Sequence, residues 1–328
     1  MAARNAFDIV ETTIADIHAA YRSGALKARE LVQGYLDRIA AYDKAGPKIN
    51  SIITINPRAL EEADRLDAAM DSKGPIGALH GVPVVTKDQA DVDGMPTTLG
   101  SILFKDFNPG RDCFVASQLK KAGAIILGKG TLGELGAGDT HGTLYGSTRN
   151  PYDLERTVGG SSGGPAAAVS ANLATVSIGQ EGLASIRRPA IWCNVAGMRP
   201  SIGLVSRTGV CEGWPAMNGS LGPMARTVTD MAKLLDAMVG YDKDDPSTAH
   251  GVGHYPASFA ELLDAGALKG ARLGILREPM GLYSEPDSED FAKITEVFDR
   301  AEGGGPPARR WRRRGRDSAP LANRGAAS

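Results

Sequence analysis

Residues 159–190 read GGSSGGPAAAVSANLATVSIGQEGLASIRRPA, and this stretch says more about fold and chemistry than any other part of the chain. Ser161 and Ser162 lie in a frame of four glycines, and Ser185 follows 24 residues after Ser161. Glycine permits backbone conformations that a Cβ forbids, and it lets main-chain N–H groups approach a ligand closely. Residues 166–174 predict a helix whose positive N-terminal end faces the first two serines. The second serine-containing bend favours a serine-based site over an ordinary glycine–serine turn.

Size and charge limit the classes of protein that this chain can represent. It has 328 residues, 42% of them hydrophobic, and a formal net charge of −1. This is enough for one large domain or two smaller ones with a substantial core. The near-neutral charge gives no indication of a nucleic-acid or membrane partner. The N-terminal sequence has no apolar run typical of a signal peptide, and no stretch reaches membrane-spanning length.

Cysteine and histidine usage indicates neither a disulfide framework nor a metal site. The three cysteines, at positions 113, 193 and 211, are odd in number and far apart, which favours a reducing compartment such as the cytoplasm. The five histidines include no HExxH motif. His250 and His254 have a four-residue spacing, but they lie in the loop-like sequence AHGVGHYP. We therefore expect no metal site.

Hydrophobic spacing predicts alternating helices and short buried strands, a pattern typical of α/β proteins. Residues 240–258 contain turn-forming residues and predict a linker or a surface excursion. The predicted elements are two helices within 7–42, helices at 57–71, 112–122 and 226–239, and strands at 82–86, 124–127 and 271–276.

The C-terminal end has a different composition. From Gly303 it reads GGGPPARRWRRRGRDSAPLANRGAAS, with six arginines between positions 309 and 316 and little apolar periodicity. We expect one domain over residues 1–301 and a disordered tail over 302–328. Two other interpretations are a polybasic nucleic-acid or anionic-surface binding tail and the product of a shifted reading frame in GC-rich DNA.

A serine hydroxyl becomes a good nucleophile when a base removes its proton, and no histidine lies near the three serines in sequence. Lys87 ends the apolar run VPVVT within GVPVVTKDQADVDGMPTTLGS. Burial there would lower the pKa of the amine and let it accept a proton. The alternative is that Lys87 forms an ion pair with Asp88, Asp91 or Asp93 at the strand end. The residues alone leave both interpretations open.

Several blocks taken together resemble the amidase signature family of serine hydrolases. The resemblance runs from about residue 7 to about residue 300 and implies an α/β fold with a mixed central β-sheet flanked by helices on both faces. It also implies hydrolysis of a carboxylic amide without a cofactor, with a small-molecule amide as substrate, and it is compatible with a homodimer. The blocks, in family order, are 81–101, 122–135, 146–153, 159–190, 197–209 and 222–240.

The resemblance implies a Ser–cisSer–Lys triad. Carried onto this sequence, Ser185 is the nucleophile, Ser161 is the bridging serine after a cis peptide bond, and Lys87 is the base. Lys87 would draw a proton from Ser161, and Ser161 would draw one from Ser185 as Ser185 attacks the amide carbonyl.

The same resemblance implies supporting roles for the neighbouring residues. Ser162 would be a hydrogen-bond partner within the proton relay, and Arg187 would tie the nucleophile loop to a carboxylate. The oxyanion would be bound by backbone N–H groups between positions 182 and 185, contributed by Gly182, Leu183, Ala184 and the nucleophile itself.

The chain departs from the family pattern at two places. Before the nucleophile the family usually has Gly-Thr-Asp-x-Gly-Gly-Ser, whereas residues 179–185 read GQEGLAS. Leucine at 183 would be strained if that position needed a positive φ, so we expect a backbone that tolerates a Cβ and a reshaped acyl pocket. Family members also usually continue well past the start of the arginine-rich segment. We therefore expect a fold that is incomplete at the C-terminus, with low stability or low activity.

Two other motifs support different classes of function. Residues 160–164 fit the GxSxG pattern of an α/β-hydrolase elbow, which would make Ser162 the nucleophile and His250 or His254 its base. Residues 128–133 fit the GxGxxG pattern of a dinucleotide-binding loop after a strand-like run, but glycines interrupt the helix that this motif requires.

Two alternatives remain within the family. One is a truncated homologue without activity. The other is the amidase subunit of a glutamine-dependent tRNA amidotransferase, which works with partner subunits.

Overall fold

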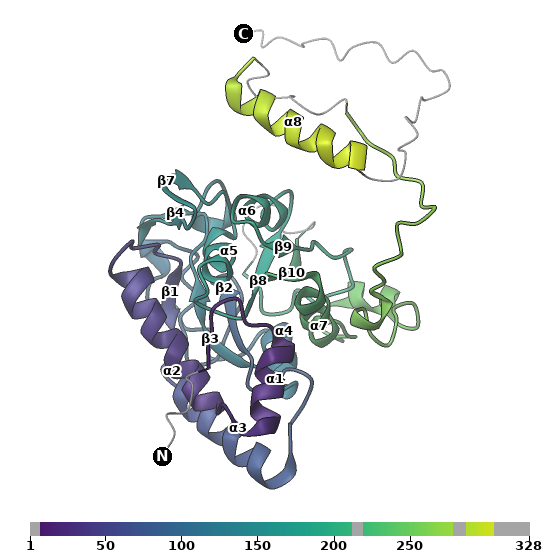
Figure 1. The fold of residues 1–328 in the computed structure, drawn as a ribbon. Coiled ribbons are helices and arrows are strands. Elements are labelled where there is room, and N and C mark those ends of the chain that lie inside the picture. The colour runs from purple at the N-terminus through teal and green to yellow at the C-terminus, as the bar shows by residue number, and fades with distance from the viewer. Residues whose placement is uncertain (1–6, 212–218, 278–286, 305–328) are drawn as a thin grey trace. The chain divides into compact units, whose positions relative to one another are not determined.

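The computed structural model describes residues 7–211, 219–277 and 287–304. The described residues form two units, divided between Leu262 and Leu263 (Figure 1). Residues 305–328 lie outside the described residues, so the domain boundary expected between 301 and 302 stays a prediction.

The first unit is built on a mixed six-stranded sheet with the strand order β1-β3-β2-β8-β10-β9. The central strands β3, β2 and β8 run parallel, and the outer strands β1, β10 and β9 are antiparallel to their neighbours. The sheet and its covering helices confirm the α/β class expected from the sequence. The strands are β1 (Ile52–Ile55), β2 (Pro83–Lys87), β3 (Ile125–Gly130), β8 (Val176–Glu181), β9 (Ala196–Gly197) and β10 (Ser220–Ala225).

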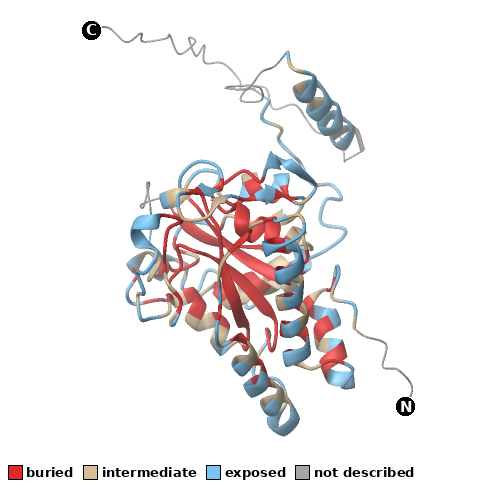
Figure 2. Ribbon diagram, turned by 90° about the vertical axis from the view of Figure 1, so that its left-hand side faces the viewer, coloured by how far each residue is buried: buried red, intermediate tan, exposed pale blue. Residues whose placement is uncertain are grey.

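Helices cover both faces of this sheet, as Figure 2 shows by the buried strands between partly exposed helices. Alternate residues of each strand face opposite sides, so Val84 packs with one group of helices and Val85 with the other. Helices α4 (Phe114–Lys121) and α7 (Val228–Met238) supply apolar side chains on one face. On the other face are α2 (Ala28–Arg38), α3 (Ala59–Lys73), α5 (Gly163–Ser170) and α6 (Arg187–Trp192), while α1 (Ile14–Ser23) contributes to both clusters.

Short elements connect this framework. A π-helical segment (Ile39–Lys44) extends α2, and 3₁₀ turns lie at Ile102–Phe104, Glu134–Gly136, Pro246–Gly251 and Ala260–Leu262. Two small hairpins pair β4 (His141–Gly142) with β5 (Gly146–Ser147) and β6 (Arg149–Asn150) with β7 (Asp153–Thr157). No helix in the described ranges is long and apolar enough to cross a membrane.

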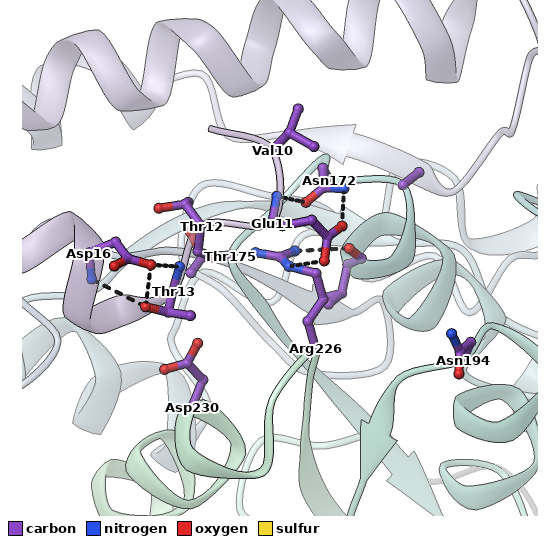
Figure 3. Close-up of polar contacts among 12 residues, drawn as sticks. Val10, Glu11, Thr12, Thr13, Asp16, Asn172, Thr175, Asn194, Arg226 and Asp230 are labelled. Atoms are coloured by element: carbon purple, nitrogen blue, oxygen red, sulfur yellow. Dashed lines mark hydrogen bonds and ion pairs between the residues drawn. The ribbon is translucent and has the colours of Figure 1, made fainter. Parts of the chain in front are cut away.

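The N-terminal segment is fastened to the rest of the unit by polar contacts (Figure 3). Glu11 accepts a hydrogen bond from the Asn172 amide at 2.8 Å, and its own backbone N–H donates to Asn172 Oδ1 at 2.8 Å. Arg226 donates to the carbonyls of Thr12 at 2.6 Å and Val169 at 2.9 Å. The contacts of Glu11 and Thr12 join residues that are more than 150 positions apart in sequence.

Most predicted elements are present within a few residues of their expected bounds. The helix expected at 166–174 begins earlier, at Gly163, and ends at Ser170. Pro165 fits its first turn because N–H groups there have no intrahelical acceptor.

The strand expected at residues 271–276 is wrong. These residues form neither a strand nor a helix, and no described strand pairs with them. The second unit contains the helix α8 (Glu289–Gly304). Arg277, which precedes this helix, forms an ion pair with Asp299 of the helix at 2.7 Å.

Candidate active site

Three parallel strands end at one edge of the sheet, and the predicted site residues gather there. Lys87 is the last residue of β2, and it lies beside Gly130, the last residue of β3. Glu181 is the last residue of β8, the other parallel neighbour of β2. The carboxyl ends of parallel strands are the usual location of sites in α/β proteins.

The structure brings Lys87 and Ser161 together. The Lys87 amine donates to Ser161 Oγ at 2.7 Å and to the backbone carbonyl of Gln180 at 3.2 Å. Both side chains are buried, and Lys87 has no exposed surface. Burial lowers the pKa of Lys87 well below its ordinary value, and the nearby Glu181 carboxylate opposes this effect. A neutral amine in this position can accept the Ser161 proton.

The alternative ion pairs of Lys87 do not form, because the three nearby aspartates have other partners. Asp88 is also fully buried, and its carboxylate contacts the second buried lysine of this region, Lys129, at 3.3 Å. The remaining pairs are Asp91 with Arg111 at 3.3 Å and Asp93 with Arg58 at 3.2 Å.

Ser161 follows a cis peptide bond with Gly160, as the family resemblance predicts. The Ser161 carbonyl accepts a hydrogen bond from the backbone N–H of Gly133 at 3.0 Å. Gly160 must be glycine, since a Cβ there would lie 2.9 Å from Asp139 Cα. The segment before α5 is therefore enclosed by the chain around residues 133–139.

Thr140 holds the same segment and was not singled out from the sequence. Its hydroxyl donates to the carbonyl of Gly159 at 2.8 Å and accepts from the backbone N–H of Gly163 at 3.0 Å. No motif marks this threonine, because its role depends on a hairpin that packs against the serine segment only in the folded chain.

Ser162 is buried and bound to the backbone of β8. Its hydroxyl donates to the Gln180 carbonyl at 3.1 Å and accepts from the Gln180 N–H at 3.2 Å. The Gln180 carbonyl thus accepts hydrogen bonds from both Lys87 and Ser162. This arrangement does not fit the nucleophile of a hydrolase elbow, whose hydroxyl is exposed at the tip of its turn. His250 and His254 are both exposed and make no hydrogen bond to Ser162.

Ser185 lies in the turn between β8 and α6, partly exposed. Its carbonyl accepts a hydrogen bond from the backbone N–H of Ser162 at 3.0 Å, which joins the two serine-containing segments. Its hydroxyl makes no hydrogen bond to another described residue, so the expected hydrogen bond between Ser185 and Ser161 is not formed in this structure.

The turn before Ser185 presents unpaired backbone donors. The N–H groups of Gly182, Leu183, Ala184 and Ser185 donate to no other described residue. Leu183 and Ala184 do not have positive φ values, so the side chains that replace the family glycines cause no backbone strain. Leu183 points outward with 67% of its surface exposed.

Glu181 and Arg187 close this turn. The Glu181 carboxylate accepts from the backbone N–H groups of Ile186 at 2.8 Å and Arg187 at 2.9 Å, and from Arg187 Nε at 2.7 Å. The sequence indicated Glu181 only as a longer acid in place of the family aspartate. The six-residue spacing between Glu181 and Arg187 across a turn was the signal that could have identified their ion pair.

The other predicted motifs do not form sites. The GxGxxG residues 128–133 continue β3 and lead to a single 3₁₀ turn, so no helix N-terminus is present to bind a phosphate. Among the described residues, no group of three or more His, Cys, Asp or Glu side chains is arranged to hold a metal ion.

Comparison with known proteins gives a consistent result. A family model described as Amidase matches residues 30–303. The chain is 39% identical over 297 residues to a glutamyl-tRNA(Gln) amidotransferase subunit from Halorhodospira halophila, covering 90% of this chain and 59% of that protein. It is also similar to the peptide amidase from Stenotrophomonas maltophilia, with 36% identity, a TM-score of 0.82, and coverage of 90% of this chain and 60% of that one. An amidase family protein from Bacillus anthracis has 32% identity and a TM-score of 0.82, over 92% of this chain and 61% of its own. This chain therefore spans about three-fifths of the length of these relatives.

Proposed function

Because this chain belongs to the amidase family, we propose that it hydrolyses the C–N bond of a carboxylic amide through a seryl acyl-enzyme. Ser185 is the nucleophile, Ser161 relays the proton and Lys87 is the base. The observation that carries the proposal is the 2.7 Å hydrogen bond between the buried Lys87 amine and Ser161 Oγ. A lysine can act as a base near neutral pH when burial removes its charge.

Acylation and deacylation use the same proton relay. Neutral Lys87 takes the Ser161 proton while Ser161 takes the Ser185 proton, and Ser185 Oγ attacks the amide carbonyl. The backbone donors at Gly182, Leu183 and Ala184 bind the resulting oxyanion. The proton then returns through Ser161 to the leaving nitrogen, the C–N bond breaks, and an ester to Ser185 remains. Water attacks this ester by the same relay and releases the carboxylic acid.

Two contacts support the idea that Ser185 reaches Ser161 when substrate binds. Ser162 N–H holds the Ser185 carbonyl at 3.0 Å, so the two serines belong to adjoining, hydrogen-bonded segments. The Ser185 hydroxyl has no competing described partner, so a rotation about its side-chain bond costs no hydrogen bond. Catalytic hydrogen bonds are often long or poorly aligned before substrate binds.

Serine-directed labelling tests this assignment. A fluorophosphonate should modify Ser185, as located by mass spectrometry of the peptides, and Lys87→Ala should abolish the labelling. Release of ammonia from a panel of primary amides should be lost in Ser185→Ala and Ser161→Ala. Labelling of Ser162 would contradict the assignment, and the absence of labelling and turnover would favour a homologue without activity.

A second candidate function is that of an amidotransferase component that releases ammonia from glutamine. The names of the relatives favour it, because the matched proteins from Halorhodospira halophila and Methanosarcina barkeri are both described as subunits of a glutamyl-tRNA(Gln) amidotransferase. Glutamine as substrate separates the two candidates. Ammonia release from glutamine that depends on added partner subunits would favour the amidotransferase component over an independent amidase.

The partners and location of the protein are also part of the proposal. We propose a cytoplasmic enzyme that acts on a small-molecule amide and binds no nucleic acid, and the family resemblance is compatible with a homodimer. The cysteines support a reducing compartment, since Cys113 and Cys193 are buried thiols that form no disulfide. Native mass spectrometry and cell fractionation test the oligomeric state and the location.

A further inference from the structure

Arg188, the second residue of α6, forms an ion pair that the proposed reaction steps do not use. Its Nη2 atom contacts Asp139 Oδ1, and the two side chains are 36% and 43% exposed. The guanidinium also lies over the Trp192 ring, 4.6 Å from the ring centroid. Asp139 lies 49 positions away in sequence, just before β4. The ion pair therefore joins α6 to the loop that precedes β4.

The two glycines before the relay serine contact both partners of this ion pair. Gly159 has a φ of +72°, and a Cβ there would lie 3.1 Å from Trp192 Cε3 and 3.3 Å from Arg188 Cγ. The next residue, Gly160, approaches the other partner, because a Cβ there would lie 2.9 Å from Asp139 Cα. The backbone of the relay segment, which we define as residues 157–162, is therefore in contact with α6 and with the loop before β4.

Asp139 is also hydrogen-bonded to the relay segment. Its Oδ2 accepts from the Thr157 hydroxyl at 2.9 Å, and this hydroxyl accepts from the backbone N–H of Gly159 at 3.0 Å. The next residue, Thr140, donates its backbone N–H and its hydroxyl to the Gly159 carbonyl at 2.9 and 2.8 Å. The Asp139 carboxylate is thus linked through one hydroxyl to the backbone two residues before Ser161.

The other partner of the ion pair is linked to the nucleophile turn, which we define as residues 182–186. The backbone N–H of Arg188 donates to the Ala184 carbonyl at 2.9 Å. The preceding side chain, Arg187, donates from Nη2 to the Leu183 carbonyl at 2.5 Å. Arg188 therefore contacts the nucleophile turn through its backbone and the relay segment through its side chain.

A direct link between the nucleophile turn and the relay segment is the hydrogen bond from Ser162 N–H to the Ser185 carbonyl at 3.0 Å. One main-chain hydrogen bond fixes a distance, but it permits the two segments to rotate relative to each other. The ion pair between Arg188 and Asp139 is a second link, and two links restrict that rotation. Because exposed ion pairs contribute little to the free energy of folding, removal of this pair should leave the fold intact.

We propose that Arg188 and Asp139 are positioning residues that hold the relay segment against the nucleophile turn, so that the Ser161 and Ser185 hydroxyls can meet when substrate binds. This inference rests on the proposed roles of those two serines. The pair acts on the rate of acylation rather than on binding, because small displacements of reacting groups reduce rates strongly.

The test compares kcat, KM and the rate of fluorophosphonate labelling at Ser185 in Arg188→Met and Asp139→Asn. Each substitution should lower kcat and the labelling rate about tenfold, while KM and Tm stay close to the wild-type values. Asp139→Asn keeps an oxygen for the Thr157 hydroxyl and so removes only the charge. The double variant should be no slower than the slower single variant, because both substitutions remove the same contact.

Two further variants control for charge and for ion-pair loss in general. Arg188→Lys keeps the positive charge that Asp139 binds and should recover most of kcat. Arg29→Met is the matched control, because Arg29 and Asp64 form another exposed ion pair, with side chains 49% and 54% exposed. It should change neither kcat nor the labelling rate.

Three results would overturn the inference. One is unchanged kcat and labelling in Arg188→Met and Asp139→Asn, and another is a double variant whose loss is the product of the two single losses. The third is a loss of kcat that is matched by a loss of folded protein, since this would show a role in folding alone.

The proposed function fails in a different way. If Ser161→Ala and Ser185→Ala retain turnover, or if the wild-type protein shows neither turnover nor labelling, the proposed function is wrong and this inference fails with it. If the two alanine variants are inactive while Arg188→Met and Asp139→Asn are as fast as the wild type, only this inference is wrong.

Discussion

At the scale of single residues, the site depends on the Lys87 amine, whose burial costs free energy if it carries a charge. Lys87 has no exposed surface and no carboxylate bound to it, and burial lowers its pKa. An unfolded lysine stays protonated up to a pH of about 10.4, so folding between the lowered pKa and that pH expels a proton from position 87. Stability therefore rises as the pH rises from the lowered pKa toward the unfolded value.

We predict that Lys87→Met abolishes amide hydrolysis and raises Tm at pH 7 by a few degrees. Methionine fills a similar volume without the cost of removing an amine from water. Differential scanning fluorimetry gives Tm, and the gain should shrink as the pH approaches 10. A gain in Tm that is independent of pH would show that the amine does not cause it.

A second prediction concerns activity and pH. Because the relay needs a neutral Lys87, kcat/KM should fall as the pH decreases through the lowered pKa of that residue. The limb should lie well below the pH of about 10.4 that is typical of an exposed lysine. Measurements of initial rate across pH 5 to 10 on a primary amide test this, and a limb near pH 10 would contradict it.

The sequence predicted some of the contacts of the site but not others. Lys87, Ser161 and the cis peptide before Ser161 followed from a family resemblance, and the two side chains are found in contact. Glu181 was recognised only as a substitution, because its role depends on Arg187 folding back across a turn. Local patterns reveal residue types, whereas the direction of a side chain depends on packing.

At the scale of elements, α5 lies directly against β3 and the start of β1. A Cβ on Gly164 would come within 2.5 Å of the Ser51 carbonyl and would also meet the backbone of Thr131. A Cβ on Gly130 would lie 2.8 Å from Pro165. The first turn of α5, which follows Ser161 and Ser162, can therefore pack this closely against the sheet only because positions 130 and 164 are glycine.

We predict that Gly164→Ala destabilises the protein by about 2–3 kcal/mol and lowers activity, since the backbone atoms on both sides cannot move apart easily. Chemical denaturation measures the free energy of unfolding. Gly274→Ala is the control, because nothing lies within 4 Å of a Cβ there. Equal effects of the two substitutions would refute this account of the helix contact.

The sequence also predicted elements unevenly. Amphipathic helices such as α4 and α7 were expected close to their observed bounds, because apolar residues at helical spacing are a strong signal. Strands β8 (VSIGQE) and β10 (SLGPMA) were not predicted, since they contain glycine or proline and lack alternation. Their place in the sheet comes from the partner strands on either side.

At the scale of the whole molecule, long-range contacts hold the first unit together. Arg226, with a side chain only 10% exposed, donates to the carbonyls of Thr12, Val169 and Ala174. Asp230, at the start of α7, accepts from the backbone N–H of Ile14 at 3.3 Å. The N-terminal segment, the end of α5 and the start of α7 thus meet at one polar cluster (Figure 3).

We predict that Arg226→Met lowers the free energy of unfolding by about 2–4 kcal/mol, because three carbonyls lose their charged donor. Urea denaturation followed by circular dichroism measures the change. Lys243→Met is the control, because it removes a 79% exposed partner of Asp244 and should leave the free energy of unfolding almost unchanged. A small effect of Arg226→Met would mean that water replaces the guanidinium.

The overall architecture was the most predictable level. Several blocks in family order implied a mixed sheet with helices on both faces, and the structure has that arrangement. The strand expected at 271–276 was wrong, because an apolar run forms a strand only where another strand offers its backbone hydrogen bonds.

In the turn between β8 and α6, the backbone geometry does not depend on the side chain at position 183. The backbone of this turn is fastened at both ends, while Leu183 points into solvent. For the proposed amidase, we therefore predict that substitutions at position 183 alter which acyl groups are accepted while the main-chain donors keep their geometry. A laboratory library restricted to this one position should then diversify the substrate preference of the proposed enzyme without disturbing the backbone contacts of Glu181 and Arg187.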